Sequence, residues 1–145
     1  MNQDALQPVP QGRYLPSIRH HDTTYTSGMT PRENGVLKYA GKIQKNGSLE
    51  TYRKAVELAT KNALSSAQAS LEENEEISKI LQLVLYLNTE DEFDKHSKIA
   101  DFASNFLVEK LGSKSIGSRV AVGVETLPSN AMVEISMICA VNLME

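Results

Sequence analysis

An arginine and a glutamate near the C-terminus are the residues whose types and spacing best suit chemistry. Arg119 opens a run in which valines alternate with small residues, and Glu134 lies in a second apolar run, 133–141. Side chains alternate between the two faces along a strand. If the apolar sets face the core, Arg119 and Glu134 share the opposite face of one hairpin. Because Ala121 and Gly123 beside Arg119 are small, we expect the floor of an anion-binding pocket there.

A guanidinium presents a planar fork that binds a carboxylate through two parallel hydrogen bonds, and a glutamate can hold and deprotonate a water molecule. The alternative interpretation of Arg119 is a solvated surface charge or an ordinary ion pair with Glu125 or Glu134. Glu134 has the same alternative, as the partner in that pair. Binding of a carboxylate and removal of a proton from water need no metal or organic cofactor, and we expect neither.

The three histidines do not form a predicted metal site. His20 and His21 are adjacent and therefore point to opposite faces of a strand, and His96 stands alone on a predicted helix. We therefore assign no metal ligands.

Length, charge and cysteine content bound the class of protein. A chain of 145 residues suits one domain, and we expect a flexible arm over 1–11 and a single domain over 12–145. The net charge of −3 and the pI near 5.7 disfavour nucleic acid as a partner. The one cysteine, Cys139, falls on a predicted core face and indicates a buried free thiol. With no signal peptide or membrane span predicted, we expect a cytoplasmic protein.

Periodicity and turn residues predict seven elements in the order strand, strand, helix, strand, helix, strand, strand. They are strands over 13–20 and 24–29, a helix from Ser48 to about Leu71, a strand over 77–88, a helix after a capping box at 89–92 that ends at Gly112, and the two strands that carry Arg119 and Glu134.

This order predicts an α+β fold in which a sheet carries both helices on one face. The strand over 77–88 is apolar on both sides, so the other face of the sheet also needs a cover. The simplest cover is a second copy of the same sheet. We therefore expect a homo-oligomer, with the pocket of Arg119 at or near a subunit boundary.

Three segments, 26–31, 85–93 and 119–135, resemble the RidA/YjgF reactive-intermediate deaminase family, whose older names are L-PSP endoribonuclease and translation initiation inhibitor. The resemblance extends in order over nearly all of the chain after Gly12, and its most specific part is the segment from Arg119 to Ile135. The long loops at 32–48 and 112–118 are more like those of a longer subgroup.

The resemblance implies a chorismate-mutase-like fold and a homotrimer whose three clefts lie between subunits. It also implies hydrolysis of small enamine and imine acids, such as 2-aminoacrylate and 2-iminobutanoate, to 2-keto acids and ammonia. The substrate is then a small imine that bears a carboxylate, with no membrane and no nucleic acid as partner.

The resemblance also implies roles for individual residues. Arg119 matches the arginine that grips the substrate carboxylate, and Glu134 matches the acidic residue near the attacking water. Tyr14 matches the tyrosine after the first glycine, and Ser27 and Gly28 match the segment that lines the cleft from the neighbouring subunit. Without the family resemblance, two structural interpretations are as well supported as these roles. Tyr14 would then be a packed aromatic residue, and Ser27–Gly28 would be the start of a tight turn.

The chain departs from the family pattern at three places. Ala121 stands where founding members carry a cysteine, so any role of that thiol is absent. Ser97 stands where an asparagine is common, and Gly12-Arg13-Tyr14 replaces Gly-Pro-Tyr. The sequence leaves two alternatives to the deaminase. One is a non-catalytic sensor of a small keto or amino acid, and the other is the endoribonuclease or translation inhibitor of the older names, against which the acidic pI counts.

Overall fold

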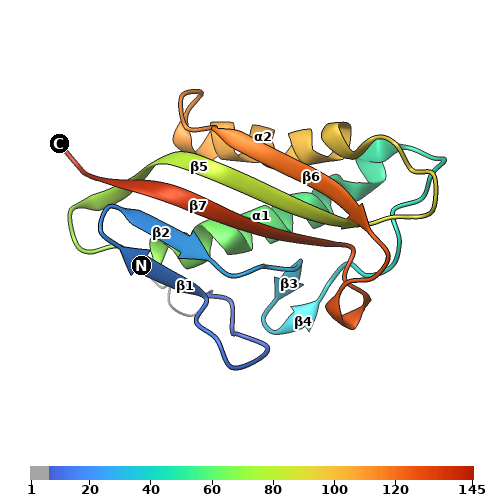
Figure 1. The fold of residues 1–145 in the computed structure, drawn as a ribbon, viewed down its shortest axis with the longest axis horizontal. Coiled ribbons are helices and arrows are strands. Elements are labelled where there is room, and N and C mark those ends of the chain that lie inside the picture. The colour runs from blue at the N-terminus through green and yellow to red at the C-terminus, as the bar shows by residue number, and fades with distance from the viewer. Residues whose placement is uncertain (1–6) are drawn as a thin grey trace.

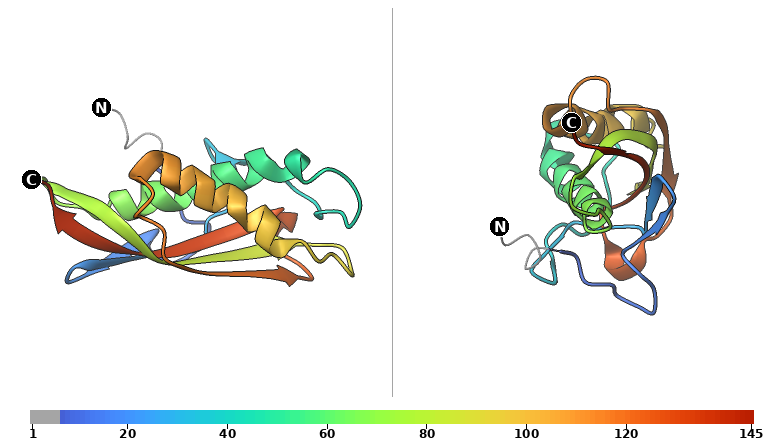
Figure 2. Two further views of the ribbon diagram at one scale, coloured as in Figure 1. Left: turned by 90° about the horizontal axis from the view of Figure 1, so that it is seen from above. Right: turned by 90° about the vertical axis from the view of Figure 1, so that its left-hand side faces the viewer.

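The structure, a computed structural model, describes residues 7–145 and contains a five-stranded sheet with two helices on one face (Figures 1 and 2). The predicted α+β class is therefore confirmed. The sheet has the strand order β1-β2-β7-β5-β6, and a separate two-stranded ribbon pairs β3 with β4. The strands are β1 Ser17–His20, β2 Thr23–Thr26, β3 Arg32–Glu33, β4 Val36–Leu37, β5 Glu75–Asn88, β6 Ser118–Val124 and β7 Val133–Leu143; the helices are α1 Arg53–Gln68 and α2 His96–Leu111, with 3-10 turns η2 Leu49–Tyr52 and η3 Pro128–Asn130.

Strand β5 is the fourth of the five strands and lies between β7 and the edge strand β6. It pairs in parallel with β6 and antiparallel with β7, so the hairpin predicted for the last two strands is wrong. The reason is the apolar character of β5 on both sides. A strand of that kind is best placed between two neighbours, where both of its edges are hydrogen-bonded and its helix-facing side is covered.

The faces predicted for β6 are also wrong. Val120 and Val122 lie on the face without helices and are 43% and 40% exposed. Arg119, Ala121 and Gly123 face α2 instead. Space explains the inversion, because a Cβ atom added at Gly123 would lie 2.7 Å from Nε2 of His96. No side chain larger than glycine fits beside His96 at this position, and the alternation along β6 then places the valines on the open face.

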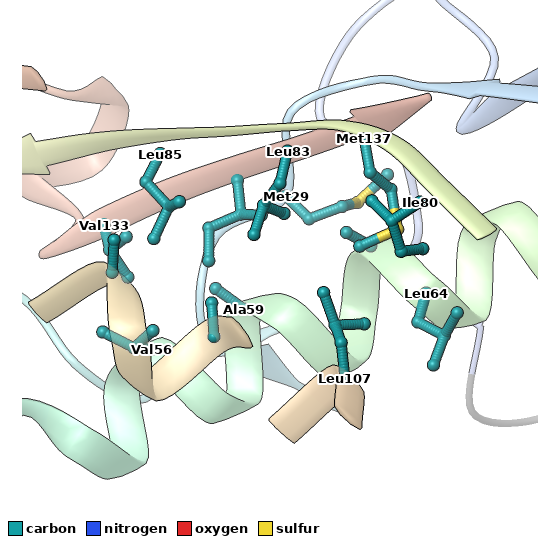
Figure 3. Packing of buried hydrophobic residues seen from close by; sticks show 14 of the residues in the cluster. Met29, Val56, Ala59, Leu64, Ile80, Leu83, Leu85, Leu107, Val133 and Met137 are labelled. Carbon is teal, nitrogen blue, oxygen red and sulfur yellow. The ribbon is translucent and has the colours of Figure 1, made fainter. Parts of the chain in front are cut away.

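Helix α1 packs closely on the sheet because its buried face is built largely from alanine. Leucine, isoleucine and valine side chains of β5 and β7 fill the layer between the sheet and the two helices (Figure 3). The fully buried members include Ala55, Ala59, Ala63 and Ala67 of α1, Leu85 and Leu87 of β5, Val133 and Ile135 of β7, and Ile99 and Leu107 of α2. No helix within residues 7–145 has the length and apolar content that a bilayer crossing requires.

The predicted capping box does not begin α2. Thr89 continues from β5 and forms a parallel bridge with Ile43, so it is not free to cap a helix. Glu92 has a positive φ of 67°, and the helix begins only at His96 with no side-chain cap. Its end agrees with the prediction, since Gly112 has a φ of 100° and donates its N–H to the carbonyl of Val108 at 2.8 Å.

The single cysteine is fully buried in β7, as predicted. Burial raises the pKa of the Cys139 thiol to about 12. At neutral pH the thiol is therefore protonated and packs as a small apolar group.

Candidate functional site

A cavity of about 640 Å³ brings together four of the residues predicted for the site. Tyr14, Ser27, Gly28 and Glu134 all line its wall. The other walls come from the β3–β4 ribbon, from α1 and from η3. Residues 7–11, the described part of the predicted flexible arm, line the cavity as well, and residues 1–6 lie outside the described residues.

Gly28 makes room for the carboxylate of Glu134. Met29 and Ile135 exchange both backbone hydrogen bonds, at 2.7 and 2.8 Å, and in this antiparallel bridge Gly28 and Glu134 lie diagonally across from each other on one face, within reach of the long glutamate side chain. A Cβ atom added at Gly28 would lie 2.2 Å from Oε2 of Glu134. Only glycine therefore allows the carboxylate to take this position against the backbone.

We expect Gly28→Ala to lower the free energy of unfolding by about 1–3 kcal/mol because the new methyl group overlaps the Glu134 carboxylate. The same change in a Glu134→Ala background should have a much smaller effect, since the overlapping atoms are gone. Urea unfolding of the four proteins measures this coupling. Equal effects of Gly28→Ala in the two backgrounds would show that Gly28 does not act on Glu134.

Glu134 is half-buried and has no hydrogen-bond or ion-pair partner among residues 7–145. Burial raises the pKa of its carboxyl group above the usual value of 4.5. An unpaired carboxylate in a partly desolvated wall is a free acceptor for a ligand proton or a water molecule.

Arg119 does not pair with Glu134, because the two residues lie on opposite faces of the sheet. In the aligned strands Arg119 lies beside Leu83 and Met137, which face the helices, whereas Glu134 lies beside Tyr86 on the open face. The prediction that Arg119 and Glu134 share a face is therefore wrong. Arg119 and Ala121 are also absent from the cavity wall of their own chain.

Helix α2 holds the Arg119 guanidinium through three side chains at positions i, i+4 and i+7. One Nη donates to Oδ1 of Asp101 and to Oγ of Ser104, both at 2.9 Å. The other Nη donates to Oγ of Ser97 at 2.8 Å and to the Ser97 carbonyl at 3.2 Å. The alternative interpretation of Arg119, an ion pair with Glu125 or Glu134, is therefore also wrong, because its ion pair is with Asp101.

Basic and amide side chains that the sequence analysis did not select also line the cavity. Arg32 and Lys61 supply two positive charges on its wall, and Asn62 donates to the backbone carbonyls of Thr30 and Arg32 at 3.0 and 2.8 Å. The sequence feature that could have identified Arg32 is its position as a basic residue in the turn-rich segment directly after Ser27–Gly28. Within residues 7–145, no three His, Cys, Asp or Glu side chains gather in a way that suits a metal ion.

A family model described as Endoribonuclease L-PSP matches residues 4–141. The protein Atu1372, of unknown function, from Agrobacterium tumefaciens is 27% identical, with a TM-score of 0.80 over 94% of this chain and 86% of its own. A candidate endoribonuclease from Shewanella oneidensis is 26% identical, with a TM-score of 0.76 over 92% of this chain and 89% of its own.

More distant relatives also match over most of the chain. E. coli TdcF, solved with bound serine, is 16% identical, with a TM-score of 0.64 over 97% of this chain and 95% of its own. The curated Protein TCP17 of Trypanosoma cruzi is 23% identical over 136 residues, which span 92% of this chain and 84% of that protein.

Proposed function

The chain belongs to the endoribonuclease L-PSP family, also called the RidA/YjgF family, and we propose that it hydrolyses 2-imino and enamine acids to 2-keto acids and ammonia. The observation that carries the proposal is the unpartnered, half-buried carboxylate of Glu134 in a cavity shared with Tyr14, Ser27 and Gly28. The proposed substrates are small acids such as 2-aminoacrylate and 2-iminobutanoate. TdcF was solved with serine, and a ligand derived from an amino acid suits this cavity too.

The proposed site is composite and forms between copies of the chain in a homotrimer. Arg119 and Glu134 cannot meet within one subunit, because a sheet separates them. The helix-free face of the sheet (Figure 2) exposes large apolar side chains that a neighbouring copy would cover. These are Ile18, Tyr25, Tyr86, Val120 and Val122. We propose that Arg119 and Ala121 of one subunit close the cavity of the next.

The proposed roles of Arg119 and Glu134 follow from the chemistry of their side chains. In the proposed complex Arg119 binds the substrate carboxylate and fixes the orientation of the molecule. The protonated imine carbon is electrophilic, so water adds to it once Glu134 has accepted a proton from that water. The nitrogen of the resulting carbinolamine then takes up the proton that Glu134 returns. Its C–N bond breaks as the hydroxyl oxygen forms the C=O bond and releases its proton to water, which leaves ammonia and the keto acid.

Tyr14, Ser27 and Ala121 are proposed to shape the site. The Tyr14 hydroxyl accepts the backbone N–H of Gln11 at 3.1 Å, and Ser27 donates its hydroxyl to the carbonyl of Leu15 at 2.6 Å. Hydrogen bonds to the backbone therefore hold both hydroxyl groups in the cavity wall. Ala121 leaves space beside Arg119 where founding members of the family carry a thiol.

The substrate carboxylate has to replace Asp101 on Arg119, so we expect Asp101→Asn to lower KM by up to about fivefold with little change in kcat. The Asp101 side chain is 59% exposed, and pairs of such exposure contribute at most about 1 kcal/mol. Steady-state kinetics measures the change, with Asp94→Asn as the matched control on an exposed residue that contacts Lys95 instead. A higher KM in Asp101→Asn would show that Asp101 orients Arg119 for the substrate.

The proposed function is tested by generating an imine with an amino-acid oxidase and following its loss with and without the protein. We expect the wild-type protein to accelerate imine loss. No acceleration by a folded protein would remove the deaminase proposal, and binding of 2-ketobutyrate without turnover would then identify a ligand-binding protein. Cleavage of RNA in the same preparation would instead favour the activity in the family's name, which the net charge of −3 does not support.

A further inference from the structure

Arg32 differs from the other half-buried arginines of residues 7–145 because no carboxylate within these residues pairs with it. Arg19 binds both oxygens of Glu75 at 2.6 and 2.7 Å. Arg53 pairs with Glu50, and Arg119 pairs with Asp101. Arg32 forms no salt bridge with any described residue, although it is half-buried like the other three and lies in the wall of the cavity.

The contacts that Arg32 does make are long and involve neutral groups. One Nη donates to the carbonyl of Gly35 at 3.2 Å, and the other lies 3.4 Å from Oγ of Ser129. Its Nε–H is buried and has no hydrogen-bond partner. Leaving a buried donor of a charged group unsatisfied is more costly than leaving a neutral one. The guanidinium is therefore short of acceptors, and an anion in the cavity would supply them.

The backbone around Arg32 is fixed, which favours a site that exists before a ligand binds. Asn62 on α1 donates to the backbone carbonyls on either side of Pro31. Arg32 also pairs with Leu37 across the β3–β4 ribbon. A guanidinium on an anchored backbone loses little freedom when it binds an anion.

Arg32 and Glu134 line the same cavity of about 640 Å³, which lies in the size range of sites for ligands larger than a four-carbon acid. Lys61 adds a second positive charge to the wall, and Glu33 is the acidic lining residue besides Glu134. Glu33 is exposed and makes no ion pair with Arg32. A second negative group on the substrate would therefore find its partner at Arg32.

We propose that Arg32 binds a side-chain carboxylate of the substrate, so that the preferred substrates are 2-imino dicarboxylic acids. This inference rests on the proposed function, in which Arg119 of a neighbouring subunit holds the carboxylate next to the imine. Glu134 then lies between two carboxylate-binding arginines, at the place where water adds. Substrates with apolar side chains leave Arg32 without a partner.

The test compares kcat/KM for the imines formed by oxidation of glutamate and of 2-aminobutyrate. We expect the wild-type protein to prefer the dicarboxylic imine by about tenfold or more, and Arg32→Gln to lower this ratio by about tenfold, which equals about 1.4 kcal/mol. Arg13→Gln is the matched control, because it removes an equal charge from an exposed residue outside the cavity wall, and it should leave the ratio unchanged.

A binding measurement separates this inference from the proposed function. Calorimetry with 2-oxoglutarate and 2-ketobutyrate needs no turnover and also reports whether the variant is folded. Tighter binding of 2-oxoglutarate that Arg32→Gln abolishes, in a protein that hydrolyses no imine, would support the dicarboxylate site and reject the deaminase. Hydrolysis of both imines at equal efficiency, with no change in ratio in Arg32→Gln, would reject the dicarboxylate site alone.

Discussion

Glu134→Gln is expected to lower kcat for imine hydrolysis by about 10²- to 10⁴-fold, the contribution of a positioned general base. Glutamine keeps the size of the side chain and fits against Gly28, but it cannot accept a proton from water. The wild-type pH profile should show an acidic limb whose midpoint lies above 4.5, because burial raises the pKa of Glu134. This limb should be absent from the residual activity of the variant.

The same substitution is expected to stabilise the protein at neutral pH. A glutamate whose pKa is higher in the folded than in the unfolded state binds more protons when folded, so its contribution to stability falls as pH rises above 4.5. At neutral pH the folded protein therefore carries the full penalty of a desolvated, unpaired carboxylate. Glutamine removes this penalty, and the gain should disappear in acid, where Glu134 is protonated in both states.

Kinetics and thermal unfolding of one Glu134→Gln preparation measure both effects. Glu125→Gln is the control, because Glu125 is exposed and its carboxylate makes no contact within residues 7–145. A Glu134→Gln variant that is more stable but less active than the wild type would show that the carboxylate serves catalysis at the expense of stability. Full activity in Glu134→Gln would instead leave the proposed mechanism without its base.

Arg119→Gln is expected to lower kcat/KM by about 100-fold, with a large part of the effect in KM. The substitution removes the fork that binds the substrate carboxylate, and losing one partner of an enclosed charge pair costs about 2–5 kcal/mol. Arg119→Lys should show an intermediate loss, since an ammonium keeps the charge without the planar geometry.

The stability of Arg119→Gln should change little, because Asp101 is largely exposed and can be solvated when its partner is lost. Arg53→Gln is a suitable control, since it also removes an arginine that is paired with a carboxylate of its own subunit. Wild-type kinetics in Arg119→Gln would show that Arg119 only joins β6 to α2.

The order of the five main-sheet strands and the two helices could be predicted from periodicity and turn residues, and the position of both helices on one face from that order. The β3–β4 ribbon was not among the predicted elements. The separation of β6 from β7 could not be predicted, because hairpin reasoning gives weight to neighbours in sequence, whereas β5 takes the place between them. The orientation of β6 failed for a related reason. The rule that large apolar residues face the core assumes one isolated chain, and Val120 and Val122 lie on the face that a neighbour would cover.

The sequence could predict four residues that line the cavity, but it could not predict where Arg119 lies. Tyr14, Ser27, Gly28 and Glu134 line one cavity, although they come from three separate parts of the chain. Arg119 faces α2, and a sequence does not show that Asp101, 18 residues away, will hold it. Arg32 was missed for the same reason, because its lack of a counter-ion is visible only when the partners of the other arginines are known.

The central claim, that one subunit supplies Arg119 and its neighbour supplies Glu134, is tested most directly by mixing two variants that are each strongly impaired. Arg119→Gln and Glu134→Gln chains, co-expressed in equal amounts with different tags and purified as mixed oligomers, should regain activity. If each site takes Arg119 from one chain and Glu134 from the next, about a quarter of the sites in a random mixture are intact. Mixed oligomers with no more activity than the separate variants would contradict the account.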